Sequence, residues 1–107
     1  MMREIKTENE YNELLSNDKL VVLDIFAEWC GPCKSMMPVL EELSDEHESS
    51  VEIVKMDADN DEISTILQSF RVRSIPTLIV IKNGEVQTTL IGARTKNELS
   101  ETISQFV

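Results

Sequence analysis

The strongest pattern along the chain is an almost unbroken run of apolar residues at positions 19–27. A strand that is apolar on both faces is typical of the centre of a sheet that is covered by helices on each side. Asp24 interrupts this run. A carboxylate at such a position either lies at the margin of the sheet or is a buried group kept for chemistry, and the pattern alone leaves both interpretations open.

Residues 51–57 predict a second central strand, which Lys55 interrupts much as Asp24 interrupts the first. If the two strands are neighbours, an inward Lys55 pairs with Asp24 and offsets part of the cost of burying either charge. The alternative is that Lys55 extends its amine to solvent.

A hairpin is predicted near the end of the chain. Pro76 precedes an apolar run at residues 77–81, where proline is tolerated because the ladder of hydrogen bonds has not begun. Asn83-Gly84 is typical of a tight turn, after which the chain returns through residues 86–90 to Gly92. Gly92 indicates a bulge or a place where another backbone comes close.

Apolar residues recur at helical spacing between and after these strands. The predicted helical faces are Tyr11, Leu14 and Leu15; Met36, Leu40, Leu43 and His47; Ile63, Ile66, Leu67 and Phe70; and Leu99, Ile103 and Phe106. Thr7 and Thr95 each begin a capping box, and Asn60 is a suitable cap for the third helix. Pro38 lies inside the second helix, where we expect it to remove one hydrogen bond and produce a kink. With a short edge strand around Ile5, strands alternate with helices until the terminal hairpin, which predicts an α/β fold with a mixed sheet and helices on both faces.

Length and charge narrow the class of protein. The 107 residues fit one domain, residues 1–107, without an internal repeat or linker. The formal net charge of −10 argues against nucleic acid and anionic membranes as partners, because both need clustered Lys and Arg. No apolar stretch resembles a signal peptide or reaches transmembrane length, so a cytoplasmic location is the default expectation.

The chemistry of the chain is expected at Cys30 and Cys33, its only two cysteines, which are separated by Gly31 and Pro32. This spacing lets the two sulfurs close into a disulfide and open again with little backbone movement. If a helix begins inside the motif, its unpaired N–H groups and positive dipole end favour a thiolate on Cys30, and Pro32 suits the first helical turn. Cys33 lies one turn further in and is expected to be more buried. We therefore expect Cys30 to attack and Cys33 to resolve.

Two other interpretations of the cysteine pair are weaker. A closed zinc site needs two more ligands, but there is no third cysteine, and His47 is the only histidine. A structural disulfide closing so short a loop removes little entropy from the unfolded chain. A cytoplasmic pair at this spacing is more often redox-active, and its presence after residues 19–27 favours a chemical role for Asp24.

The charged residues are unevenly distributed. Ten of the twenty acidic residues lie between positions 41 and 62, where Lys55 is the only Lys or Arg, and we interpret this segment as a solvated face. Four cations lie in the cysteine motif or in loops expected to converge on it: Lys34, Arg71, Arg73 and Arg94. We therefore expect the face around the cysteines to be less acidic than the rest, so that exchange with partner proteins responds to ionic strength.

The sequence resembles the thioredoxin family over nearly its whole length. The matching residues are Asp24, the segment Phe26-Ala27-Glu28-Trp29-Cys30-Gly31-Pro32-Cys33-Lys34, Pro38, Lys55, Asp57, Asp59, Ser74-Ile75-Pro76-Thr77, Lys82-Asn83-Gly84 and Gly92-Ala93. Gly-Pro between the cysteines is the pattern of the family's reducing members. Two departures are Phe26, where many members have tryptophan, and Arg71, where glycine is frequent.

The resemblance implies a three-layer α/β/α thioredoxin fold, with a mixed five-stranded sheet flanked by four helices. It also implies that Cys30 attacks a client disulfide, that Cys33 resolves the mixed disulfide, and that Asp24, tuned by Lys55, accepts the proton of Cys33. The residues implied to bind the client are Trp29, Gly31, Pro32, Ile75, Pro76, Gly92 and Ala93. Pro76 is implied to follow a cis peptide bond beside the dithiol.

The implied activity is protein-disulfide reduction by a monomer without a bound cofactor or metal. Its implied partners are disulfide-containing client proteins and a thioredoxin reductase, linked to NADPH or ferredoxin. Two alternatives remain at this point: a disulfide oxidase or isomerase, and a binding subunit of the same fold in which redox turnover is secondary.

Overall fold

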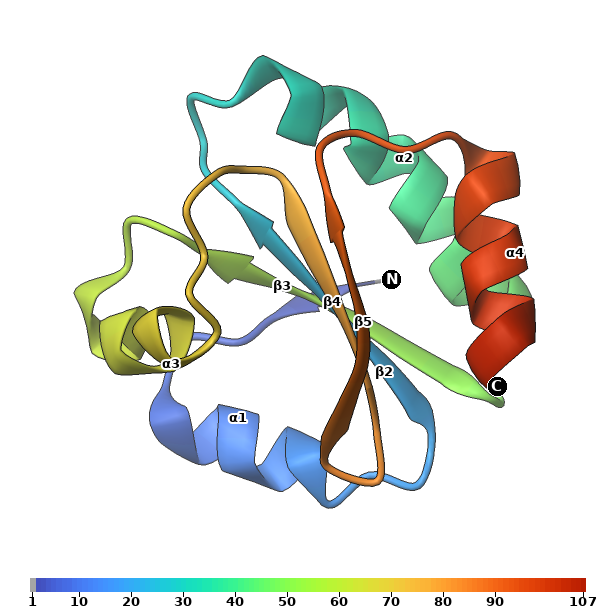
Figure 1. Cartoon of the computed structure of the whole chain (residues 1–107), viewed down its shortest axis with the longest axis horizontal. Coiled ribbons are helices and arrows are strands. Elements are labelled where there is room, and N and C mark those ends of the chain that lie inside the picture. The colour runs from blue at the N-terminus through green and yellow to red at the C-terminus, as the bar shows by residue number, and fades with distance from the viewer. Residues whose placement is uncertain (1) are drawn as a thin grey trace.

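A five-stranded mixed sheet runs through the middle of the computed structural model, which describes residues 2–107 (Figure 1). The strands are β1 (Arg3–Glu4), β2 (Leu20–Phe26), β3 (Val51–Asp57), β4 (Thr77–Lys82) and β5 (Glu85–Ile91). Their spatial order is β1-β3-β2-β4-β5, with β1, β3 and β2 parallel and β4 antiparallel to both of its neighbours. The strand that precedes the cysteines is therefore the central one, as its apolar run predicted.

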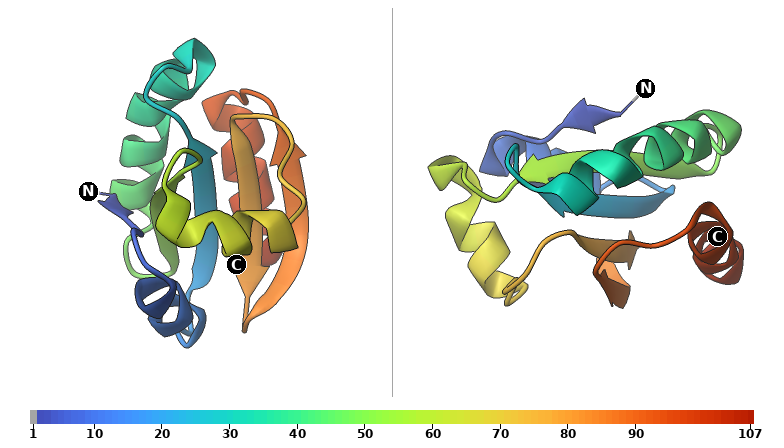
Figure 2. Two further views of the ribbon diagram at one scale, coloured as in Figure 1. Left: turned by 90° about the vertical axis from the view of Figure 1, so that its left-hand side faces the viewer. Right: turned by 90° about the horizontal axis from the view of Figure 1, so that it is seen from above.

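Helices cover the sheet on both sides (Figure 2). They are α1 (Glu8–Leu15), α2 (Gly31–Glu46), α3 (Ser64–Ser69) and α4 (Lys96–Phe106). Side chains of α2 and α4 pack on one face of the sheet, and side chains of α1 and α3 pack on the other. This is the three-layer α/β/α arrangement that the resemblance implied. Among residues 2–107, no helix combines the length and the apolarity needed to span a membrane.

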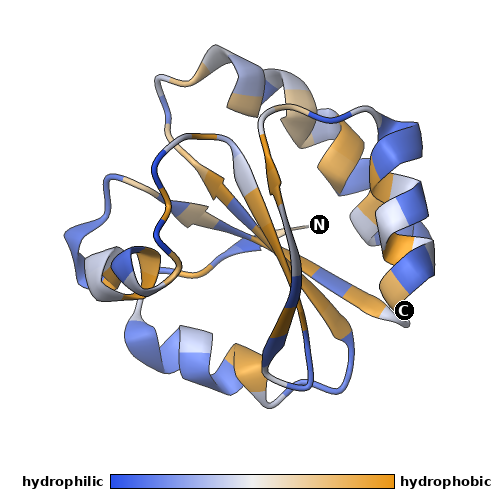
Figure 3. Ribbon diagram, in the orientation of Figure 1, coloured by the Kyte–Doolittle hydropathy of each residue, from blue (hydrophilic) through white to orange (hydrophobic). Residues whose placement is uncertain are grey.

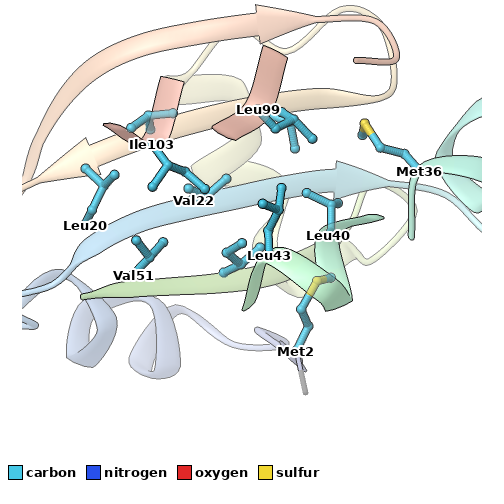
Figure 4. Close-up of a cluster of buried hydrophobic side chains, with 12 residues drawn as sticks. Met2, Leu20, Val22, Met36, Leu40, Leu43, Val51, Leu99 and Ile103 are labelled. Carbon is cyan, nitrogen blue, oxygen red and sulfur yellow. The ribbon is translucent and has the colours of Figure 1, made fainter. Parts of the chain in front are cut away.

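Alternation along β2 divides the core into two layers. Leu20 and Val22 belong to the cluster beneath α2 and α4, whereas Leu23 and Ile25 belong to the cluster beneath α1 and α3. The apolar strands and the polar outer faces of the helices are visible in Figure 3, and Figure 4 shows side chains of α2 and α4 meeting β2. All seven residues of β2 are buried, so a polar side chain in this strand has no route to the surface.

The helix starts follow the predicted caps, with one difference. Thr7 and Thr95 both form complete capping boxes. Asn60 caps a three-residue 3-10 turn at Asp61–Ile63, and α3 begins only after it, so the predicted third helix is split. Helix α2 continues through Pro38.

Backbone angles explain two other positions. Arg71, at the end of α3, has a φ of 56°, the left-handed conformation that glycine adopts without the roughly 1–2 kcal/mol cost of a side chain. Gly92 has a φ of 91°, and its N–H donates to the carbonyl oxygen of Pro76 at 2.9 Å. An added Cβ at Gly92 would meet no atom within 4 Å, so the positive φ, and not a lack of space, accounts for glycine at this position. The irregularity in the β4–β5 pairing lies at Val80 and Ile81.

Candidate active site

The two cysteines lie where β2 gives way to α2. Cys30 is the N-cap residue of the helix, and its Sγ accepts a hydrogen bond from the N–H of Cys33 at 3.2 Å. The two residues form a disulfide, with their Cα atoms 5.3 Å apart. Pro32 occupies the first turn, where a missing N–H has no cost. The start of α2 therefore directs its N–H groups and its positive dipole end toward the sulfur of Cys30, which favours a thiolate there when the disulfide is open.

The two cysteines differ in burial in the predicted sense. Cys30 is 4% exposed and Cys33 is 1% exposed. Both pack with Phe26 and Ala27 in a small apolar cluster, against which Ile75 also packs. Both cysteines are therefore buried, and Cys30 keeps slightly more contact with solvent than Cys33 does.

Asp24 is buried in the middle of β2. Its side chain is 0% exposed, and within residues 2–107 neither of its carboxylate oxygens has a hydrogen-bond partner. The alternation of β2 directs it to the face covered by α2, the same face as Val22. Burial raises the pKa of Asp24 to about 7, although the charge of Lys55 lowers it. The carboxyl group can therefore both hold and release a proton near neutral pH.

Lys55 lies opposite Asp24 in the parallel pairing of β2 and β3. It is half-buried, and its Nζ lies 5.5 Å from the centre of the Phe26 ring. Lys55 acts on Asp24 through its charge, because no hydrogen bond joins the two side chains. Lys55 also lines a hollow of about 170 Å³ together with Phe26, Ala27, Glu28, Cys33, Lys34 and Met37. Within residues 2–107, Lys55 and Asp24 therefore do not form the expected close ion pair, and Lys55 is neither fully buried nor fully exposed.

A larger hollow of about 390 Å³ lies beside the dithiol. It is lined by Trp29, Ala58, Val72, Arg73, Ser74 and Ile75. The indole of Trp29 is 70% exposed and is held by a hydrogen bond from its Nε1 to Asp59 Oδ2 at 2.9 Å. Ile75 both lines this hollow and packs on the cysteine cluster, so it connects the two.

The other predicted client-binding residues differ in how far they are exposed to solvent. Gly31 and Pro32 are exposed at the start of α2. Pro76 follows a cis peptide bond and is buried, so it presents mainly its backbone, which Gly92 contacts. Ala93 is exposed just beyond Gly92.

Sequence reasoning missed three of the six residues that line the larger hollow: Ala58, Val72 and Ser74. Ala58 and Asp59 follow β3, and the N–H of Ala58 donates to the carbonyl oxygen of Phe26 at 2.7 Å. The available signal was the parallel pairing of two central strands, because the chain segments after their carboxyl ends meet at the same edge of a sheet. Val72 and Ser74 come from the connection between α3 and β4, which carries no periodic pattern.

The four cations expected near the cysteines do not all converge there. Lys34 lines the smaller hollow and Arg73 lines the larger one. Arg94 donates to the carbonyl oxygen of Ile91 at 3.2 Å and lies 3.8 Å from the carboxylate of Glu98. Arg71 lines neither hollow.

No metal site accompanies the cysteines in the part of the chain that the structure describes. Residues 2–107 contain no cluster of three or more His, Cys, Asp or Glu side chains placed to hold an ion. His47 is the C-cap residue of α2, at the opposite end of the helix from Cys30.

Known proteins resemble this chain over most of its length. The family model described as Thioredoxin matches residues 2–105. A thioredoxin of Listeria monocytogenes is 47% identical over 92 residues, which cover 86% of this chain and 87% of that protein. A thioredoxin of Rickettsia prowazekii is 36% identical over 107 residues, covering 100% of both chains. Among solved structures, the germline-specific thioredoxin Deadhead of Drosophila melanogaster has a TM-score of 0.89 at 30% identity, covering 99% of this chain and 100% of that one.

Proposed function

This chain belongs to the thioredoxin family, and from that premise we propose how its residues divide the work of disulfide exchange. The protein is a thiol-disulfide oxidoreductase, and its dithiol reduces protein disulfides. The observation that carries the proposal is the reversible Cys30–Cys33 pair at the start of α2, on the same sheet face as the buried Asp24.

In the first step, the thiolate of Cys30 attacks one sulfur of the client disulfide. A bond forms between Cys30 and that sulfur, and the client disulfide breaks, so the other client sulfur leaves as a thiolate and takes up a proton. The helix N-terminus supports this role, because it favours the charged form of Cys30.

In the second step, Cys33 attacks the sulfur of Cys30. The mixed disulfide breaks, the second client sulfur leaves as a thiolate, and the protein keeps the Cys30–Cys33 disulfide. The client gains two electrons and becomes two thiols, while the protein dithiol is oxidised. Cys33 must lose a proton to attack, and Asp24 is the group that accepts it, because its pKa of about 7 suits proton transfer near neutral pH.

Lys55 keeps Asp24 from becoming too weak an acid, since its charge opposes the effect of burial. The hollow shared by Lys55 and Cys33 gives this region contact with solvent, through which the proton leaves.

The client chain lies beside the dithiol, against Trp29, Gly31, Pro32 and Ile75. The backbone around Pro76, Gly92 and Ala93 borders the same site. Exposure of the Trp29 ring and the adjacent hollow support this placement.

The oxidised protein is returned to the dithiol form by a reductase. The activity of this family needs no bound cofactor, so the electrons come from a partner protein. We assign this role to a thioredoxin reductase linked to NADPH or ferredoxin, acting on a cytoplasmic monomer.

Trapping the mixed disulfide tests the division of roles between the cysteines. A Cys33→Ser variant keeps the attacking sulfur but lacks the resolving one, so it accumulates a covalent complex with a client disulfide. Non-reducing electrophoresis with mass spectrometry measures this complex, and a reductant releases it. The matched Cys30→Ser variant traps far less, because its remaining sulfur is the more buried one. Equal trapping by the two variants would show that the roles are misassigned.

A further inference from the structure

The larger hollow beside Trp29 continues onto α3. A second hollow, of about 230 Å³, is lined by Ala58, Ser64, Leu67, Gln68 and Val72. Ala58 and Val72 line both hollows. The two hollows are therefore adjacent, and together they are called the Trp29–Gln68 groove, which extends from Trp29 and Ile75 to the α3 residues Ser64, Leu67 and Gln68.

Arg73 is the only charged side chain that lines the Trp29–Gln68 groove. It is exposed, and within residues 2–107 its guanidinium forms no ion pair or hydrogen bond. The stretch of residues 70–84 around it contains no acidic residue, although the whole chain has a net charge of −10. Arg73 is thus a cation without a partner among side chains that are otherwise uncharged. The nearest carboxylate that the structure ties to this lining is Asp59, which accepts a hydrogen bond from Trp29.

The other side chains of the groove suit an extended peptide with apolar contacts. Trp29, Ala58, Val72, Leu67 and Ile75 offer apolar surface, and Gln68 and the two serines offer hydrogen bonds. None of these neutral groups distinguishes a carboxylate from an amide by charge. The guanidinium of Arg73 does, because it is a cation and presents a planar set of donors that matches a carboxylate.

We propose that Arg73 is a specificity-determining residue that favours client disulfides with an Asp or Glu side chain close to the attacked cysteine. The inference rests on the proposed function, since it assumes that a client segment lies in the Trp29–Gln68 groove during exchange. The distance between Arg73 and the dithiol is limited by the chain between them. Ile75 packs on the cysteine cluster, and Arg73 is two residues away from Ile75, which is about 7 Å of extended chain. The acidic side chain therefore lies within about three residues of the client cysteine.

A set of peptide disulfides tests this preference. Each is the disulfide-linked dimer of a short peptide with one cysteine, so both sulfurs have the same neighbours. A glutamate is placed at one of the three positions on either side of the cysteine, and the reference peptide has glutamine throughout. Chromatography of the released peptide thiol measures the second-order rate constant for reduction by the dithiol form of the protein.

The parent protein reduces at least one glutamate peptide about two- to fivefold faster than the glutamine peptide, the range expected for a partly exposed ion pair. Arg73→Gln removes this ratio, and Arg73→Glu inverts it. The matched control is Arg71→Gln, which removes the same charge from an exposed arginine that does not line the groove and keeps the ratio. Added salt reduces the ratio of the parent protein.

Two results would overturn the inference while leaving the proposed function intact. One is reduction of all peptides at rates independent of glutamate, and the other is equal loss of the ratio in Arg71→Gln and Arg73→Gln. Absence of reduction of every peptide by the parent protein would instead overturn the proposed function.

Discussion

Asp24 occupies its place in β2 at a cost in folding stability. In the unfolded chain its carboxyl group ionises near pH 4, whereas burial raises its pKa to about 7 in the folded protein. Below pH 4 the group is protonated in both states and the penalty is absent. Between pH 4 and 7 the unfolded chain ionises first, so the free energy of unfolding falls. Above pH 7 the full penalty of about 4 kcal/mol applies.

Replacing Asp24 with asparagine removes this ionisation. We expect Asp24→Asn to raise the free energy of unfolding of the oxidised protein by up to about 4 kcal/mol at pH 8, and to have little effect at pH 4. Urea unfolding at several pH values measures the difference. The control is Asp18→Asn, which removes one negative charge from an exposed position. A gain that did not change with pH would show that packing, and not ionisation, is responsible.

At the level of elements, the caps connect sequence and fold most directly. Thr95 is the N-cap residue of α4: its hydroxyl group accepts a hydrogen bond from the N–H of Glu98, and its own N–H donates to the carboxylate of Glu98. Because α4 packs Leu99 and Ile103 against the sheet, its first turn supports one side of the core. Thr95→Ala is expected to lower the free energy of unfolding by about 1 kcal/mol, measured by urea unfolding, while Thr95→Ser keeps most of it. Equal losses in both variants would show that the hydroxyl group is not the stabilising feature.

Elements that follow from a pattern of adjacent residues could be predicted from the sequence. Features that depend on contacts between distant segments, or on a pattern that fits two structures, could not. The apolar run of β2 and the turn at Asn83 and Gly84 each follow from a few adjacent residues. The break between the 3-10 turn and α3 was missed, because a spacing of three residues, as between Ile63 and Ile66, fits either helix type.

The candidate site divides in the same way. Cys30, Cys33 and Asp24 stood out because each departs from its local pattern. The Trp29–Gln68 groove did not stand out, because its walls come from α3 itself and from the segments that follow β2, β3 and α3. Only the parallel pairing of β2 with β3 brings Ala58 beside the segment that follows Phe26.

The whole molecule determines the direction in which electrons flow. A thermodynamic cycle links the reduction potential of the Cys30–Cys33 pair to the difference in folding free energy between the disulfide and dithiol forms. A fold that stabilises the dithiol form makes an oxidant, and a fold that stabilises the disulfide form makes a reductant. We expect the buried, unpartnered Asp24 to change this balance with pH. A thiolate formed near Asp24 on reduction repels the Asp24 carboxylate, so ionisation of the thiol and ionisation of Asp24 are coupled.

For a reducing thioredoxin we expect a potential of about −270 mV, against about −180 to −120 mV for disulfide isomerases and oxidases. Equilibration with a dithiol buffer, with zinc excluded, measures the fraction of oxidised protein, and reduced and oxidised forms are separated after alkylation. A variant with Gly31 and Pro32 replaced is the matched comparison, because these residues lie between the sulfurs and are exposed. Every 30 mV changes the free energy of this two-electron exchange by about 1.4 kcal/mol, so the two ranges are clearly separated. A potential in the upper range would mean that the protein oxidises or isomerises client disulfides.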